Sequence, residues 1–368
     1  MVPVQSACSR LSLVFSVTAA LGFACCDRPV SAGVAFTNLG PATDYNVFVL
    51  GNATMQWTDA QGRVAVGGNA NFNGYTIASG QSASSSIANL VVGGNYTNNS
   101  TTLNGPIVIG GDANINNPTI NGNLSVNGNV TLTASGSINH GTLTHGGMLS
   151  QGSVTFNNVL NTSALTPLPI DFAAAKEYLT TESAYLANLA ATGTTVVQYG
   201  GITLTSVGTD LLQVFNVDGA SLSSANHLAI NAAAGQTVVI NISGVTDNFR
   251  YFGIDVTGTD RQHVLYNFYD ATSLTIAGIS VQGSILAPLA DVNFSNGNIE
   301  GTLIAGSLAG SGESHDFMFR GSIPSPPVEE PPPPVVVTQT PEPSSLILAG
   351  IGGLGLFVAA RRRRATSH

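Results

Sequence analysis

The most regular feature of the chain is an alternation of short apolar runs and turn residues that returns several times between residues 64 and 150. Each copy is a β-branched run followed by Gly-Gly-Asn or a variant of it. The copies lie at 64–70, 90–96, 107–113, 124–129 and 145–148. The apolar run suits a half-buried strand, and glycine and asparagine suit a tight corner with positive φ. Because one copy cannot bury a core alone, the pattern predicts rungs stacked in a β-solenoid.

Asparagine is concentrated at these corners, where it tolerates the left-handed region. Stacked rungs should let the amides pair from one rung to the next. The alternative is that the amides form a sugar- or ice-binding surface, although turn chemistry alone accounts for asparagine beside glycine. The asparagines concerned are Asn69, Asn71, Asn73, Asn95, Asn114, Asn116, Asn121, Asn123, Asn127 and Asn129.

Segments on either side of the repeats complete the predicted domain, which covers residues 33–323. Within residues 36–58, the phrase 45–52 alternates and then becomes apolar, which predicts a strand that caps the first rung. After Pro167 and Pro169, Asp171 can cap a helix over 171–191. The inner face of this helix is predicted from helical spacing as Ala175, Tyr178, Leu179, Tyr185, Leu186 and Leu189.

Strand-like runs return after the helix, from Val196 onward. The predicted fold class is therefore all-β, a right-handed β-helix or solenoid with one long helix packed along its wall. The helix interrupts a single solenoid. A signal helix is expected before this domain and a transmembrane helix after it.

Composition indicates an exported β protein that does not bind nucleic acid. Of 368 residues, 43% are hydrophobic and only 8% are charged, against about 25% in ordinary soluble domains. Between residues 33 and 343 there are 5 basic and 19 acidic residues, so the net charge of this part is 5 − 19 = −14. Such a chain has no basic patch with which to neutralise phosphates.

The first 32 residues are predicted to be a signal peptide. The apolar stretch 11–24 follows Arg10 and leads to the small residues of 30–32, which suit cleavage before Gly33. All 3 cysteines of the sequence fall in this segment. The mature protein is therefore expected to be exported and to contain no thiol.

The C-terminal end consists of a linker, a short motif, an apolar run and a basic stop. A Pro-rich linker over 324–343, stiff and extended at ~3.1 Å per residue, ends in Pro341, Glu342 and Pro343. An apolar run over 346–360 follows within the sorting segment 344–368, and the basic stop after it is Arg361, Arg362, Arg363 and Arg364. The run is short against the ~20 residues of a permanent span, and the arginines keep its end cytoplasmic. This order of segments resembles the PEP-CTERM sorting signal that exosortases recognise. The resemblance implies an exosortase as processing partner and a transient inner-membrane anchor.

The domain itself contains several characteristic phrases in a fixed order. They are 46–49, the Val-Gly-Gly-Asn repeats, 264–268, 283–288, 299–305 and 313–315, with Phe319 and Gly321. Together they resemble the choice-of-anchor A family of bacterial surface proteins. The resemblance implies an adhesive β-helix domain on the cell surface or in the extracellular matrix, for example in a biofilm. No catalytic residue comes with the family, and we expect no metal and no cofactor. The expected partner is extracellular polysaccharide or another surface ligand, and the sequence leaves open a sugar, a protein, a second copy of the chain or no ligand.

Candidate chemistry is confined to Glu313, His315 and Asp316, which could bind a cation or act as acid and base. We interpret them instead as a polar closing turn at the last rung of the solenoid. A polysaccharide-degrading β-helix enzyme is the alternative function, but it needs several carboxylates on one face, and the repeats contain a single acid, Asp112. An ice-binding solenoid is a further alternative, although Thr-x-Thr occurs in the repeats only at 131–133 and 142–144.

Overall fold

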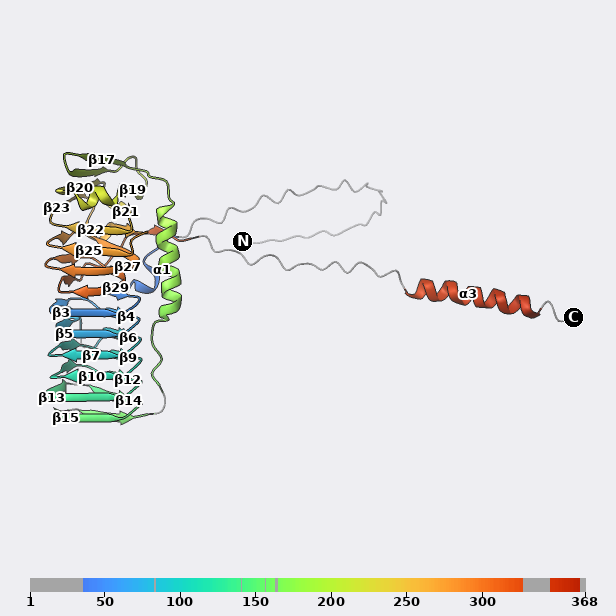
Figure 1. Ribbon diagram of the computed structural model, residues 1–368, viewed down its shortest axis with the longest axis horizontal. Helices are drawn as coiled ribbons and strands as arrows, with labels where there is room; N and C mark the ends of the chain where they lie inside the picture. Colours follow the sequence, from blue (N-terminus) through green and yellow to red (C-terminus); the bar gives the residue numbers. More distant parts are fainter. Residues whose placement is uncertain are drawn as a thin grey trace, which may run out of the picture.

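The computed structural model describes residues 36–82, 84–139, 141–155, 157–162, 165–326 and 345–364. Most of the described residues form a column of stacked parallel strands, with a long helix along its side (Figure 1). The predicted signal peptide over 1–32 and the motif Pro341, Glu342 and Pro343 lie outside the described residues.

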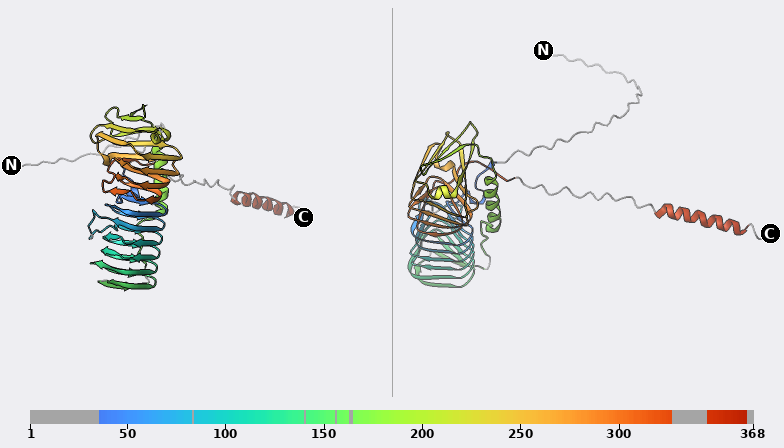
Figure 2. Two further views of the ribbon diagram at one scale, coloured as in Figure 1. Left: turned by 60° about the vertical axis from the view of Figure 1, so that its left-hand side comes forward. Right: turned by 45° about the horizontal axis from the view of Figure 1, so that its top comes forward.

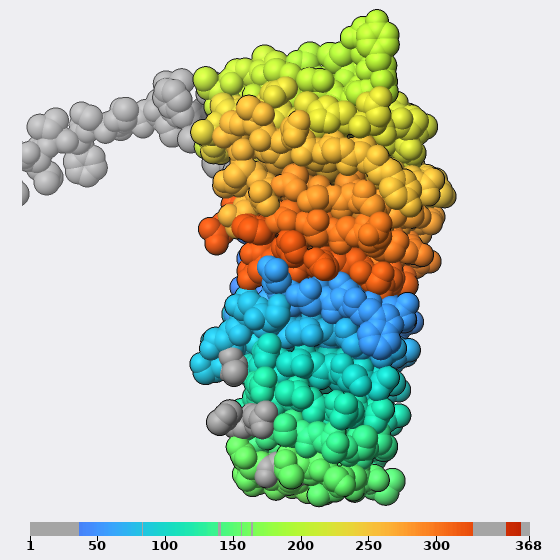
Figure 3. Space-filling view, turned by 90° about the vertical axis from the view of Figure 1, so that its left-hand side faces the viewer, coloured from blue at the N-terminus to red at the C-terminus, as the bar shows by residue number. Residues whose placement is uncertain are grey.

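The chain enters the column at its middle. β2 (Val47–Val49) pairs in parallel with β4 (Val64–Val66) on one side and with β29 (Leu303–Gly310) on the other. From β2 the chain winds to one end, returns along the column as α1 (Phe172–Ala187), and winds back from the opposite end to β29 (Figures 1 and 2). In Figure 3 the blue N-terminal rungs lie directly against the orange C-terminal ones.

The prediction that residues 36–58 cap the first rung is therefore wrong. β2 and β3 (Ala53–Ala60) form a central rung, and both edges of that rung are paired. The C-terminal half supplies the neighbour that the sequence pattern could not reveal. At one end of the column lies an antiparallel hairpin of β17 (Thr194–Gln198) and β18 (Gly201–Thr205), and at the other end lies β15 (Leu149–Thr155) (Figure 1).

The remaining strands follow the predicted alternation of short runs and corners. In the N-terminal half they are β5 (Ala70–Ile77), β6 (Leu90–Val92), β7 (Tyr96–Asn99), β8 (Thr102–Asn104), β9 (Ile107–Ile109), β10 (Ala113–Asn116), β11 (Thr119–Asn121), β12 (Leu124–Val126), β13 (Val130–Asn139), β14 (Thr142–His145) and β16 (Asn158–Asn161).

The C-terminal half contains the corresponding strands and three short helical turns complete the domain. The strands are β19 (Leu212–Asp218), β20 (His227–Ala232), β21 (Thr237–Ser243), β22 (Thr246–Arg250), β23 (Gly253–Gly258), β24 (Val264–Phe268), β25 (Ser273–Ala277), β26 (Ser280–Val281), β27 (Ser284–Ser295), β28 (Asn298–Glu300) and β30 (Glu313–His315). The turns are η1 (Gly40–Ala42), α2 (Gly219–Ser223) and η2 (Arg261–His263), and β1 (Phe36–Thr37) pairs antiparallel with β31 (Ile323–Pro324).

The Gly-Gly corners have a different cause from the one predicted. Neither Gly93 nor Gly110 has a positive φ. A Cβ on Gly93 would instead overlap the carbonyl oxygen of Gly67 in the rung below, and a Cβ on Gly110 would overlap that of Gly93. Glycine is needed at this corner because successive backbones approach too closely for a side chain.

Beside this corner the predicted asparagine ladder takes another form, in which side chains bond the backbone of the next rung. None of the ten asparagines named above has a positive φ. The Asn69 side-chain oxygen accepts a hydrogen bond from the backbone N–H of Asn95 at 2.8 Å, and Asn95 accepts one from Asp112 at 2.9 Å. Asp112 and Asn129 continue the series in the next rungs. Each corner therefore holds the backbone of the next one in register.

The helix α1 begins where the sequence predicts but ends earlier. The Asp171 carboxylate accepts hydrogen bonds from the backbone N–H groups of Ala173 and Ala174 at 3.0 and 3.1 Å, which makes Asp171 the N-cap. The helix ends at Ala187 rather than at 191. Its buried residues are Ala175, Leu179, Glu182, Ser183 and Leu186, whereas the predicted Tyr178, Tyr185 and Leu189 are half-buried.

One wall of the column packs against α1, as predicted. Outward-facing Ala65, Val91 and Leu265 join Leu179 and Leu186 in one buried apolar cluster. We call this surface, which contains β2, β4, β6, β9, β12 and β14 with β19, β21, β24, β27 and β29, the helix wall.

A buried polar ladder fixes α1 on the helix wall. The Asn267 amide donates hydrogen bonds to the side-chain oxygen of Asn241 and to the Ser183 carbonyl, both at 2.9 Å. The Ser183 hydroxyl donates back to Asn267 at 2.6 Å, and the Asn241 amide donates to the Leu186 carbonyl at 2.8 Å. Since buried amides are costly without partners, these contacts select one position of the helix.

The apolar run that was predicted as a transmembrane helix forms α3 (Ser345–Arg364). Across the described ranges, no helix combines the length and the apolar character that a membrane crossing requires.

Candidate binding face

A second wall of the column consists of ten stacked strand segments whose outward side chains reach solvent. In spatial order the segments belong to β22, β25, β27, β29, β3, β5, β7, β10, β13 and β15, and each pairs in parallel with the next. At about 4.8 Å per step, the nine steps span roughly 43 Å. We call this surface the open wall.

The central outward column of the open wall contains short side chains and no charge. Every second residue points outward, as the pleat requires, and the residues between them, such as Phe72, Ile115 and Phe249, are buried in the core. The column runs through Asn248, Thr275, Asn293, Ala309, Thr54, Asn71, Thr97, Asn114, Thr131 and Ser150.

A neighbouring column on the same wall is joined by hydrogen bonds between side chains. The Asn99 amide donates to the side-chain oxygen of Asn73 at 3.1 Å, and the Asn116 amide donates to that of Asn99 at 2.8 Å. The Thr133 hydroxyl donates to Asn116 at 3.0 Å. These amides are fixed in orientation, and their remaining donors and acceptors are repeated once per rung.

The chemistry of the open wall is that of repeated polar groups. The open wall presents hydroxyl and amide groups at a constant spacing on a rigid sheet. Its central column contains no nucleophile beside a base and no pair of carboxylates, which acyl transfer and glycoside hydrolysis require. A ligand that fits it has regularly spaced polar groups of its own.

Of the three residues predicted as a polar site, the structure brings two together. His315 Nε2 lies 3.4 Å from Glu313 Oε2, and His315 Nδ1 lies 2.8 Å from Glu300 Oε1. Arg261 Nη1 donates to the other Glu300 oxygen at 2.7 Å. Glu300 is buried, and its Oε1 also accepts a hydrogen bond from Asn298 Nδ2. With three partners, its carboxylate serves to hold two strands and the Arg261 turn together.

Asp316 lies apart from this pair. Its carboxylate accepts a hydrogen bond from Gln81 Nε2 at 2.5 Å. Burial raises the pKa of Asp316, although Arg63 and Arg320 oppose the shift. The three predicted residues thus do not form one site.

The place of this cluster also differs from the prediction. Ser314, between Glu313 and His315, pairs with Ala60 of the N-terminal half. The closing turn therefore lies at the central junction and not at an end of the column. Sequence reasoning missed Glu300, although it lies one rung before His315 and opposite it in register, so the rung spacing could have found it.

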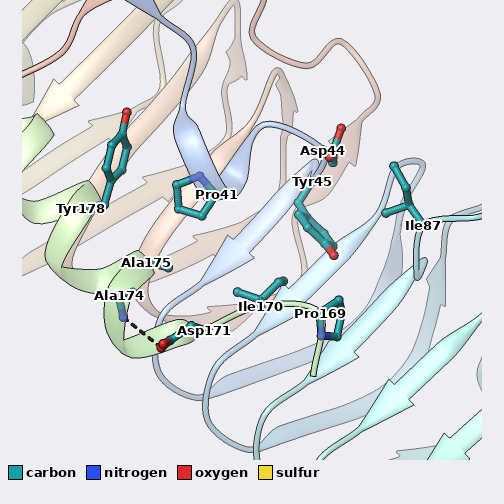
Figure 4. A pocket seen from close by; sticks show the side chains of 10 residues that line it. All are labelled: Pro41, Asp44, Tyr45, Ile87, Pro169, Ile170, Asp171, Ala174, Ala175 and Tyr178. Atoms are coloured by element: carbon teal, nitrogen blue, oxygen red, sulfur yellow. Dashed lines mark hydrogen bonds between the residues drawn. The ribbon is translucent and has the colours of Figure 1, made fainter. Parts of the chain in front are cut away.

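A cavity of about 530 Å³ lies where η1 meets the start of α1 (Figure 4). Its walls include Pro41, Tyr45, Pro169 and Ile170, and the Asp171 carboxylate at its edge is bonded to the helix backbone. Burial, with help from the nearby Asp44 charge, raises the pKa of Tyr45 to about 12. The cavity therefore offers mainly apolar contact, with Asp44 and Asp171 as the two carboxylates of its lining.

The acidic and histidine side chains do not converge into a metal centre in the described ranges. No group of three or more His, Cys, Asp or Glu residues there could hold a metal ion.

Comparison with known families gives two matches. The model of the family described as "Putative Ice-binding-like adhesive domain" matches residues 38–316, about three quarters of the chain. The model of the PEP-CTERM protein-sorting motif matches residues 339–364, which implies an exported precursor processed by an exosortase. No curated protein and no solved structure matches the chain.

Proposed function

Since the chain belongs to the family of the Ice-binding-like adhesive domain, we propose that it is a non-enzymatic adhesin of the cell surface or extracellular matrix. The observation that carries the proposal is the open wall, a rigid surface about 43 Å long with an uncharged central column and repeated amide and hydroxyl groups. Weak contacts repeated along one molecule, and again over many copies, give avidity without a deep pocket.

The proposal includes the route to the surface. A leader over 1–32 directs export, the apolar run 346–360 holds the precursor briefly in the inner membrane, and an exosortase acts near Pro341, Glu342 and Pro343. We also propose membership of the choice-of-anchor A group, on the phrases that carry that resemblance. The solenoid winds right-handed, in keeping with the hand of parallel β crossovers.

The enzyme alternative has little support from the candidate residues. Both oxygens of Glu300 are engaged, and Asp316 faces Gln81 rather than His315. The two Thr-x-Thr steps lie on different walls of the column, which argues against one flat ice-binding face. Thr131 lies on the open wall, whereas Thr142 and Thr144 belong to β14 on the helix wall.

The test compares the parent protein with a double variant, Glu313→Ala with His315→Ala, for attachment to native matrix and for turnover of matrix polysaccharides. We expect both proteins to attach and neither to release sugars. If the parent cleaves glycans and a folded double variant does not, the adhesin proposal is wrong and the protein is an enzyme.

A further inference from the structure

Two large aromatic side chains lie exposed at one corner of the column, at the edge of the open wall. Trp57 and Tyr251 are each 69% exposed. Trp57 lies against Gly74 of the next rung, where a Cβ would touch its ring, and Tyr251 lies in the same way against Gly278. Each ring therefore has glycine beneath it and a broad surface toward solvent.

The backbone at this corner is left-handed in both halves. Trp57 has φ +54° and Tyr251 has φ +61°, a strained conformation that is an outlier for bulky residues. The other residues of this corner with positive φ are small or polar, namely Gly74, Ser100, Asn117 and Ala134 in one half and Gly278 and Asn296 in the other. The corner thus does not need an aromatic ring to form.

The two rings stand in a defined relation to each other. From the Tyr251 strand β22, the ladder passes through β25, β27 and β29 to β3, which contains Trp57. Four steps of about 4.8 Å place the two corners roughly 19 Å apart along the column axis. The uncharged central column of the open wall runs beside both of them.

We propose that Trp57 and Tyr251 are two stacking platforms for one extended, neutral polysaccharide chain that lies along the open wall. The electron-rich faces of the rings attract the C–H groups of sugar rings, while the Thr and Asn columns exchange hydrogen bonds with the sugar hydroxyls. A neutral polymer fits because the central column offers no charge, and the Arg250 guanidinium, 5.7 Å from the centre of the Tyr251 ring, adds further donors. This inference rests on the proposed function and names its ligand class.

The chain contains a single tryptophan, so its intrinsic fluorescence reports on Trp57 directly. The experiment titrates the protein released from its native cells with hydroxyethyl cellulose and dextran as neutral probes and alginate as a polyanionic probe. We expect a saturable blue shift of the emission with a neutral probe and none with alginate. Unchanged emission at saturating binding would contradict the proposal.

Single substitutions test whether the polysaccharide binds to the two rings. Trp57→Ala and Tyr251→Ala should each weaken binding about tenfold, as for a buried interface anchor, while Trp57→Phe should retain most of it. The matched control is Tyr199→Ala, because Tyr199 is 91% exposed and has positive φ but lies in the β17–β18 hairpin. Thermal melts of every variant establish that it is folded.

The outcome is separable from that of the proposed function. The double variant, Trp57→Ala with Tyr251→Ala, is tested for attachment to matrix once it is shown to be folded. Attachment at the level of the parent would contradict the role of the two rings in binding and would leave the adhesin proposal unaffected. Attachment that survives digestion of the matrix polysaccharides would point to a protein partner and also overturn the inference.

Discussion

The side-chain amide of Asn46 donates a hydrogen bond of 2.7 Å to the carbonyl oxygen of Gly301, which lies 255 positions later in the chain. The same amide donates to the His315 carbonyl at 2.9 Å, and its oxygen accepts from the backbone N–H of Gly62 at 3.2 Å. One fully buried side chain thus joins the first rung of the chain to its last.

Asn46→Ala should therefore weaken the junction between the two halves. It leaves buried backbone groups without partners, and we expect the free energy of unfolding to fall by about 2–4 kcal/mol. Urea denaturation measures the loss. Asn114→Ala on the exposed open wall is the control and should change stability by no more than about 0.5 kcal/mol; equal effects of the two changes would contradict the role of Asn46.

Gly93→Ala should destabilise the column although its φ is ordinary. The added methyl group would overlap the Gly67 carbonyl oxygen, and overpacking of this kind costs about 1–3 kcal/mol. In Gly253→Ala the nearest atom to the new Cβ is His227 Nδ1 at 3.7 Å, so this control should melt like the parent. A Gly93→Ala protein that melts like the Gly253→Ala control would refute the close-packing account of the corner.

Glu182 makes the free energy of unfolding depend on pH. This residue of α1 is fully buried, and neither of its carboxylate oxygens has a hydrogen-bond partner. Burial raises its pKa from 4.5 to about 7. The folded protein therefore binds this proton more tightly than the unfolded chain. The resulting stabilisation is complete below about pH 4.5 and is lost as the pH rises through 7.

Glu182→Gln tests this dependence. We expect the variant to exceed the parent in stability at pH 8 by about 1–3 kcal/mol, and to have a flatter profile between pH 5 and 7. Some slope remains, because burial and the nearby Asp218 and Asp270 raise the pKa of Asp247 to about 6. Parallel profiles for parent and variant would rule out Glu182 as the source.

The sequence predicts those parts of the fold that depend on neighbours along the chain. The β-branched runs and the Asp171 cap are local signals, and the structure confirms both. The Asn69 corner is different, because its hydrogen bond joins residues 26 apart in the chain and Asn69 does not have the predicted positive φ. The central place of β2 depends on β29, about 250 residues away, and no local pattern records that pairing. The cause of the Gly93 corner likewise lies in the adjacent rung.

The candidate site was harder to predict, for a related reason. The open wall arises from the register of ten strands, so Thr54, Thr97 and Asn248 look like ordinary exposed strand positions in the sequence. Trp57 gives no signal as an isolated aromatic residue. Its exposed position depends on the positive φ of Trp57 and on Gly74 beneath the ring. Both are properties of the folded corner.

The most direct test of the account places charge on the open wall and measures attachment. Thr54→Lys with Thr97→Lys changes two exposed positions on alternate rungs, and Thr181→Lys with Ala184→Lys adds the same charge to the exposed side of α1. The quantity is the fraction of cells retained on native matrix after washing, with each protein shown to be folded. The account predicts that the open-wall variant loses attachment and the α1 variant keeps it, whereas attachment by both at the level of the parent would contradict it.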